Sequence, residues 1–266
     1  MMAHIDRPPR DIASMPRGGP DASWLVRRLQ TNRPEYLDRN DVDDLKRRVI
    51  RSLERAERLF GVHQKAARMA LDEVGDVSTP RILELGSGHG GLSRKLLENH
   101  PTAQVTVTDI DPTLVAAIAA GDLGSHPRAT VREMDATAID APDGYYDLVV
   151  FALSLHHLPP ALAARVFAEG TRAGNKLLII DARRPPAPLH LVTLAATLPF
   201  IGLFPLLHDA FISSLRAYSR SALRALAYHA DPAISVEFRS RRWGPTVVVA
   251  RHAPQPGNRH SDHERC

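Results

Sequence analysis

A glycine-rich turn behind a short apolar run constrains this chain more than any other feature. The run contains an acid, Glu84, and leads into Gly86, Gly88 and Gly90. Glycine permits a sharp bend and lets a ligand approach the main chain closely. The pattern predicts a strand, a tight turn and a helix, with a nucleotide-like cofactor at the turn. A second register that ends at Gly91 also fits the dinucleotide fingerprint, so the turn alone does not identify the cofactor.

Further apolar runs follow at regular spacing, separated by helical stretches. The pattern predicts strands at 81–85, 104–108, 129–133, 147–152 and 176–181, and helices near 90–99, 112–120 and 160–170. Two β-rich runs, 234–239 and 245–250, predict a terminal hairpin. This alternation indicates a parallel sheet with helices on both faces, in which ligands bind beyond the carboxyl ends of the strands. The polar residues expected at those ends are Glu84, Asp109, Asp135 and Ser154.

Taken in order, these motifs resemble the class I S-adenosylmethionine-dependent methyltransferases, over residues 80 to 181 and more weakly to about 251. The resemblance implies an α/β fold, a doubly wound, Rossmann-like seven-stranded sheet with an antiparallel C-terminal hairpin and a helical N-terminal extension. It also implies S-adenosyl-L-methionine (SAM) as the cofactor, with Asp109 at the ribose and Asp135 at the adenine. The residues expected to hold the cofactor are Glu84, Gly86, Ser87, Gly88, Gly90, Asp109, Ile110, Asp135, Ala136 and Ala152.

His157 and His208 are the candidates for a catalytic base. An alcohol or phenol acceptor needs a base to remove its proton, and histidine suits that role near neutral pH. His157 follows the fourth predicted strand, where it could equally fix the loop by hydrogen bonds, and His208 lies in a later apolar stretch. The favoured function is O-methylation of a small, lipophilic metabolite. The later segment resembles a subgroup of bacterial secondary-metabolite methyltransferases.

Other functions are weighed against this one. The second glycine register leaves a NAD(P)-dependent oxidoreductase open, and the same fold could serve as a cyclase or a non-catalytic cofactor-binding protein. A nucleic-acid substrate is not expected, because Phe151–Ser154 lacks the N/D-P-P-Y/F pattern of base-amine methyltransferases and no aromatic-basic module is visible. No metal is expected, because no compact ligand cluster is apparent.

The organisation of the chain follows from composition. Segments 1–20 and 252–266 are rich in Pro, Gly and charge and are predicted to be disordered around a single domain at 21–251. Within that domain, 41–74 predicts an amphipathic helical cap with a basic face, and 182–232 predicts an apolar insertion that covers the substrate.

The apolar stretch 189–207 contains no Asp, Glu, Lys or Arg. Pro199, Gly202 and Pro205 interrupt it, so a pocket wall is favoured over a membrane-spanning helix. A peripheral membrane contact or a homodimer face would use the same surface. The lone cysteine, Cys266, excludes a disulfide framework, and the first residues show no secretory signal, so a cytoplasmic location is expected.

Overall fold

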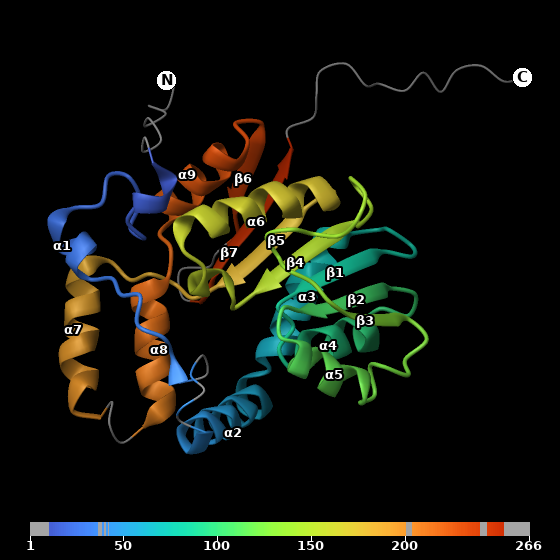
Figure 1. Ribbon diagram of the computed structural model, residues 1–266, viewed down its shortest axis with the longest axis horizontal. Coiled ribbons are helices and arrows are strands. Elements are labelled where there is room, and N and C mark those ends of the chain that lie inside the picture. The colour runs from blue at the N-terminus through green and yellow to red at the C-terminus, as the bar shows by residue number, and fades with distance from the viewer. Residues whose placement is uncertain are drawn as a thin grey trace, which may run out of the picture.

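A computed structural model of the chain describes residues 11–36, 39, 41, 43–200, 204–239 and 244–252. A seven-stranded sheet forms its centre, in the order β3-β2-β1-β4-β5-β7-β6 (Figure 1). The strands are β1 Arg81–Leu85, β2 Gln104–Asp109, β3 Ala129–Glu133, β4 Leu148–Ala152, β5 Leu177–Asp181, β6 Ile234–Phe238 and β7 Thr246–His252.

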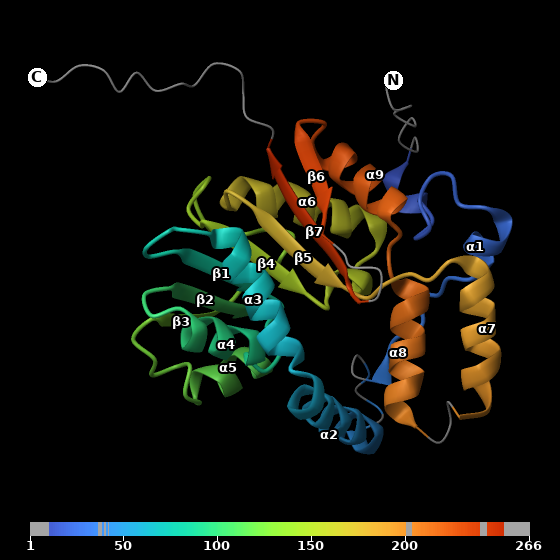
Figure 2. The same ribbon diagram turned by 180° about the vertical axis from the view of Figure 1, so that it is seen from behind.

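Strands β1 to β5 are parallel, and β7 runs antiparallel between β5 and β6. This arrangement confirms the predicted doubly wound sheet and its antiparallel terminal hairpin. Because the strands are parallel, the carboxyl ends of β1, β2, β4 and β5 lie along one edge. The arrowheads of β4 and β5 point toward helices α8 and α2 in both views (Figures 1 and 2).

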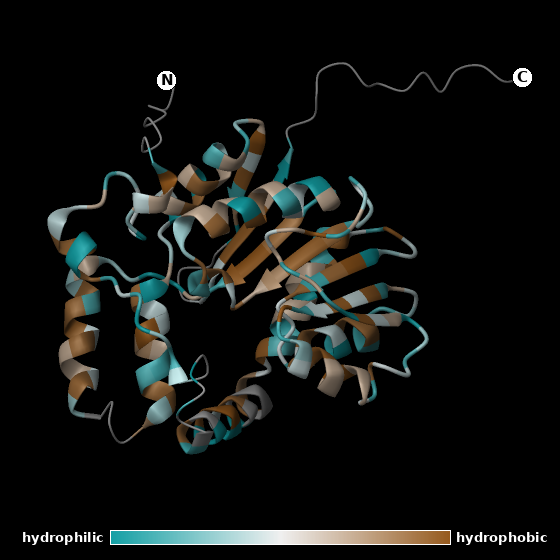
Figure 3. Ribbon diagram, viewed as in Figure 1, coloured by the Kyte–Doolittle hydropathy of each residue, from teal (hydrophilic) through white to brown (hydrophobic). Residues whose placement is uncertain are grey.

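Helices cover both faces of the sheet, as predicted. Alternate residues of β4 pack on opposite sides, Val149 with α6 Pro160–Ala173 and α9 Arg220–Ala230, and Val150 with α3 Val62–Val74, α4 Gly91–Asn99 and α5 Pro112–Ala119. Strands β4 and β5 are buried on both faces, which is why both read as continuous apolar runs. Figure 3 shows the same contrast, with apolar central strands and helices of mixed polarity.

The predicted helical cap at 41–74 consists of two helices with different roles. Helix α2 Asp43–Phe60 ends at Gly61, which adopts a left-handed φ of +56°, and α3 follows. Ala67 and Ala70 of α3 are fully buried against the sheet, so α3 belongs to the core. Only α2 stands away from the sheet, where it contacts α8 (Figure 1).

The insertion that was expected at 182–232 is shorter in the structure. It comprises α7 Ala187–Thr197, the short η4 Leu198–Phe200 and α8 Pro205–Arg216, and α7 and α8 stand side by side beyond the sheet (Figures 1 and 2). Helix α9 is part of the core instead, because Leu223 and Leu226 pack against α6 and the sheet. Within the described residues, the helices are too short or too polar to cross a membrane.

The N-terminal segment corrects another expectation. Residues 11–20 are ordered rather than disordered, with a short helix η1 Ile12–Ser14, followed by α1 Trp24–Arg28. Asp11 caps η1, and Ile12 and Met15 are buried in the core beside α6. The high content of Pro, Gly and charged residues led to the prediction of disorder, although Ile12 and Met15 are apolar and pack in the core. Residues 1–10 and 253–266, the rest of the predicted disordered segments, lie outside the described residues.

Candidate functional site

The glycine turn between β1 and α4 exposes its main chain to a ligand. Gly86, Gly88 and Gly90 all adopt left-handed conformations, with φ of +60°, +57° and +73°. A β-carbon at Gly86 would lie 3.1 Å from Oγ of Ser154, so the turn packs closely on the segment after β4. A β-carbon at Gly88 would meet no atom within 4 Å. The backbone at Gly88 therefore borders open space, as a cofactor site requires.

Asp109 ties the end of β2 to this turn. Its Oδ2 accepts a hydrogen bond from N–H of Gly88 at 2.9 Å, and its Oδ1 accepts one from N–H of Asp111 at 3.0 Å. The side chain is buried, with 7% of the residue exposed. Each carboxylate oxygen can accept a second hydrogen bond, so Asp109 retains acceptors for the vicinal hydroxyls of a ribose.

Glu84 gives the site a preference for positive charge. The residue is buried, and Oγ of Ser93 donates a hydrogen bond to its Oε2. Burial raises the pKa of Glu84 to about 7, and Asp109 adds to the rise, while the bond from Ser93 opposes it. A cationic ligand group nearby would stabilise its carboxylate. Among the described residues, Oγ of Ser87 is buried without a hydrogen-bond partner, which leaves a polar contact for a ligand.

The other residues expected at the cofactor lie along the same edge of the sheet. Ile110, which follows β2, is 64% exposed and offers an apolar surface to an adenine ring. After β3, Oδ1 of Asp135 accepts hydrogen bonds from N–H and Oγ1 of Thr137, at 2.7 and 2.8 Å, and Ala136 is half-buried. Ala152 ends β4. The residues present therefore fit a cofactor with a ribose, a base and a positive charge, which are the parts of SAM.

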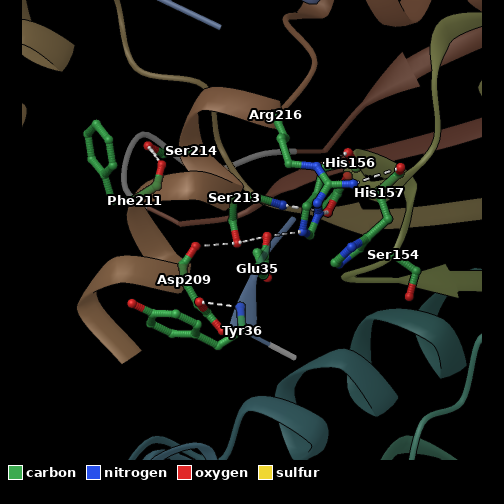
Figure 4. Close-up of polar contacts among 12 residues, drawn as sticks. Glu35, Tyr36, Ser154, His156, His157, Asp209, Phe211, Ser213, Ser214 and Arg216 are labelled. Atoms are coloured by element: carbon green, nitrogen blue, oxygen red, sulfur yellow. Dashed lines mark hydrogen bonds and ion pairs between the residues drawn. The ribbon is translucent and has the colours of Figure 1, made fainter. Parts of the chain in front are cut away.

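A buried charged cluster lies beside this site, after β4. Leu153 has a φ of +55°, a left-handed conformation that is rare for a branched residue, and the chain then enters the short helix η3 Leu155–His157. Nδ1 of His156 lies 2.5 Å from Oδ1 of Asp181. Its Nε2 lies 3.4 Å from Oε1 of Glu35, and Figure 4 shows these two side chains side by side. Burial disfavours the charged imidazole, but the two carboxylates outweigh it and raise the pKa of His156 to about 9.

Glu35 is brought to the cluster by the N-terminal segment. Oγ of Ser213 on α8 donates a hydrogen bond to Oε1 of Glu35 at 2.7 Å, and N–H of Tyr36 donates to Oδ1 of Asp209 at 2.9 Å (Figure 4). Burial alone would raise the pKa of Glu35, but His156 and Ser213 lower it below its usual value. The cluster therefore holds an imidazolium between two carboxylates.

Arginines fix the backbone around this cluster. Nη1 of Arg17 donates hydrogen bonds to the carbonyl oxygens of His156, at 2.8 Å, and of Arg216, at 2.5 Å. Nη2 of Arg216 donates to the carbonyl oxygen of His157 at 2.9 Å. Nη2 of Arg184 reaches the carbonyl oxygen of Leu29. The N-terminal segment, η3 and α8 are thereby joined into one unit.

The two predicted catalytic histidines lie on either side of Glu35 and Tyr36. The ring of His157 stacks at a tilt on that of His156, 4.2 Å between centroids, on the side of the cluster toward Ser154 (Figure 4). The ring of His208 stacks on Tyr36 at 4.1 Å, and its Nδ1 lies 2.9 Å from Oδ1 of Asp209. His157 is half-buried, and its N–H donates a hydrogen bond to the carbonyl oxygen of Ser154, the residue that packs on Gly86, whereas His208 lies on α8.

Sequence reasoning missed most of the charged cluster. Asp181 ends a strand like the other acids at this edge, a signal that was available. Glu35 stands in a segment without periodicity, and nothing local marked it. Ligand atoms of Glu35, His156 and His157 lie within 4.8 Å of one another, so the three residues could hold a cation. The sequence does not indicate this set, because Glu35 is far from the two histidines along the chain. A protonated His156 offers no lone pair, so a metal would have to displace its proton.

Known methyltransferases resemble this chain over the region that contains the glycine turn. The family model described as "Methyltransferase domain" matches residues 82–175. The chain is 29% identical over 152 residues to the demethylmenaquinone methyltransferase of Thermus thermophilus, covering 54% of this chain and 67% of that protein. It is 25% identical to a ubiquinone/menaquinone biosynthesis C-methyltransferase of Photorhabdus laumondii, covering 47% and 52%.

A solved structure agrees at the level of the fold. Human N-acetylserotonin methyltransferase, solved in complex with SAM, aligns with a TM-score of 0.57 and 18% identity, over 86% of this chain and 64% of that one. The strand order and the glycine turn thus define a Rossmann-like protein that binds an adenosine-containing cofactor. Residues 82–175 form a methyltransferase domain, and sequence and fold together support a class I SAM-dependent methyltransferase with SAM as its cofactor. These matches favour SAM over the nicotinamide cofactor that the second glycine register allowed.

Proposed function

We propose that the protein methylates an oxygen atom of a small, lipophilic acceptor, with His157 as the base. The observation that carries this proposal is the position of His157, between the buried pair of Glu35 and His156 and Ser154, which packs on the glycine turn (Figure 4). An acceptor between the cofactor and α8 would meet this imidazole.

The residues of the cluster suit proton removal. SAM supplies a sulfonium-bound methyl group, and transfer to oxygen forms an O–C bond as the C–S bond breaks. His157 takes the hydroxyl proton of the acceptor, and the carboxylate of Glu35, whose lowered pKa keeps it ionised, stabilises the imidazolium that forms. His156 and Asp181 are positioning residues, because His156 is only 4% exposed and contacts its neighbours rather than open space.

The apolar character of the acceptor is inferred from the insertion. Phe204, Val192 and Leu198 on and beside α7 and α8 are 58%, 64% and 63% exposed. Exposed apolar side chains of this size are typical of a surface that binds an apolar ligand or partner. The segment 189–207 was expected to supply such a surface.

Carbon methylation is the second candidate. It is favoured by the relative from Photorhabdus laumondii, which is named a C-methyltransferase. A phenol that is deprotonated by His157 activates its own ring carbons as well as its oxygen, so the same base would serve both reactions. Only the product can separate them.

The test is transfer of a labelled methyl group from SAM to a panel of hydroxynaphthoquinones and long-chain phenols. We expect the labelled methyl group to be recovered with the acceptor in the organic phase, and NMR of the product shows whether it is bound to oxygen or carbon. His157→Gln should lower kcat by about 100-fold or more without changing S-adenosylhomocysteine affinity, as the loss of a general base does. The control is His229→Gln, an exposed histidine on α9, which should leave kcat unchanged. An undiminished kcat in His157→Gln excludes the base assignment.

A further inference from the structure

A groove between α2 and α8 is not used by the chemistry above. It encloses about 680 Å³, within the range of small-molecule sites. We name it the α2–α8 groove, and the residues that define its two walls are Arg48, Arg51, Arg55, Phe204, Leu206 and Leu207. One wall is thus basic and the other apolar.

Among the described residues, no acid pairs with the arginines of the basic wall. Arg48, Arg51 and Arg55 follow one another at helical spacing on α2, and within the described part of the chain none of them forms an ion pair with an acid. Arg47 on the same helix differs, because its guanidinium pairs with Asp44. Three guanidinium groups on one wall create a positive potential that an anion would satisfy.

The opposite wall strengthens this potential. Helix α8 begins at Pro205, in the groove, and its N-cap residue, Phe204, makes no side-chain capping bond. The amino end of a helix of this length carries a partial positive charge, although Pro205 has no N–H and the N–H of Leu207 already bonds the carbonyl oxygen of Phe204. The side chains of Phe204, Leu206 and Leu207 add apolar surface beside it.

The groove is close to the reaction centre. Ala210 lines it, and Ser213, which bonds Glu35, follows one turn later on α8, a rise of about 4.5 Å along the helix. Figures 1 and 2 show α2 and α8 beyond the carboxyl ends of β4 and β5. A ligand in the groove could therefore extend toward His157.

We propose that the methyl acceptor is an anionic amphiphile, whose carboxylate or phosphate is held by Arg48, Arg51 and Arg55 while its apolar chain packs on α8. This inference rests on the proposed function, since it names the class of acceptor for that site. The opposed basic and apolar walls select a molecule with both characters. A neutral lipophile would leave the arginines unmatched, and a simple anion would leave Phe204 and its neighbours exposed.

The experiment uses the full chain and two fluorescent probes, dansyl-undecanoate and its uncharged methyl ester, at concentrations where both are monomeric. The wild type should bind the acid about tenfold more tightly than the ester. The double variant Arg51→Gln/Arg55→Gln should lose that preference, with ester affinity unchanged. Arg47→Gln is the matched control, and it should retain the wild-type preference because Arg47 pairs with Asp44 outside the groove.

Three outcomes would overturn the proposal: equal affinity for acid and ester, an equal loss of preference in Arg47→Gln, or arginine-dependent binding to phosphatidylglycerol vesicles without a preference for the monomeric acid. The last would make the groove a membrane contact. Parallel titration with S-adenosylhomocysteine separates the two proposals. Loss of that binding contradicts the methyltransferase site, whereas intact binding without acid preference contradicts only the acceptor class.

Discussion

The carboxylate of Asp109 holds the glycine turn in shape and faces the space where a ribose would lie. It accepts N–H bonds from Gly88 and Asp111, so one side chain fixes both the end of β2 and the turn after β1. Hydrogen bonds to a charged acceptor are stronger than neutral ones. If Asp109 also binds the ribose, as predicted, cofactor binding and the local structure of the turn depend on the same residue.

Replacing Asp109 with alanine should weaken S-adenosylhomocysteine binding by at least about tenfold, because two backbone bonds and the ribose acceptors are lost together. Isothermal titration measures this directly. Asp140→Ala is the control, since its carboxylate is exposed, pairs with Arg132 at 3.3 Å and should leave affinity unchanged when removed. Equal affinity in Asp109→Ala and the wild type would contradict the ribose assignment.

Sequence reasoning predicted that Asp109 and the glycines lie together at the ends of β1 and β2, because local geometry determines those positions. A strand that ends in an acid and a turn that requires left-handed φ leave marks in the sequence itself. The contact between Glu35 and His156 joins residues 121 positions apart (156 − 35). It depends on the hydrogen bond from Ser213 of α8 that holds Glu35 in place. No local pattern encodes such a contact, which is why this half of the site was not predicted.

At the scale of elements, the N-terminal segment is an integral part of the fold. Ile12 and Met15 are buried beside α6, and Ser219 donates its N–H to the carbonyl oxygen of Arg17 at 2.9 Å. Composition predicted disorder here because Pro, Gly and charged residues dominate the stretch. Two anchored apolar side chains and a network of arginine bonds are sufficient to order it.

Met15→Ala should therefore destabilise the whole domain by about 2–4 kcal/mol, the cost of a large-to-small change in a packed core. Urea unfolding followed by circular dichroism measures the free energy of unfolding. Leu189→Ala, at a position of α7 that is 48% exposed, should change it by no more than about 0.5 kcal/mol. If both variants unfold at the wild-type urea concentration, the segment does not contribute to the cooperative core.

The strands and core helices were predicted closely, and the elements around the site were not. Hydrophobic periodicity identifies an element that packs on the sheet, such as β4 or α6. It does not tell whether an amphipathic helix lies on the sheet or beyond it. Helix α3 and helix α2 form one continuous pattern in the sequence, yet the left-handed Gly61 separates a core helix from one that faces α8.

At the scale of the whole molecule, ionisable groups are concentrated in the interior near one sheet edge. Glu84, Asp109, Glu35, His156 and Asp181 are all less than about a tenth exposed. Buried charges reduce stability unless they are paired and hydrogen-bonded. A binding site placed there makes the stability of the protein depend on pH, and the direction of that dependence follows from the pKa values.

Folding raises the pKa of Glu84 from its ordinary value of 4.5 to about 7, and that of His156 from 6.5 to about 9. Between its unfolded and folded pKa, each group holds more protons in the folded protein than in the unfolded chain. Its contribution to the free energy of unfolding is therefore fully present below the unfolded pKa and is lost as pH rises through the folded pKa. Burial lowers the pKa of His190, which gives the opposite slope below pH 6.5. Of these three groups, only His156 titrates between about pH 7 and 9, because Glu84 in the folded protein titrates near pH 7 and His190 below pH 6.5.

Across that window the free energy of unfolding should fall by about 3 kcal/mol because His156 loses its proton between two carboxylates. The measurement is urea unfolding at several pH values for the wild type and His156→Gln. The free energy of unfolding of the wild type should exceed that of His156→Gln by the largest amount near pH 6.5, and this difference should be lost by pH 9. Glu84→Gln serves as the matched variant at the other buried group. It should match the wild type below pH 4.5 and exceed it by about 3 kcal/mol above pH 7, because glutamine cannot ionise. A difference between wild type and His156→Gln that does not change with pH would mean that His156 is neutral in the folded protein, and that Glu35 is held by Ser213 rather than by an imidazolium.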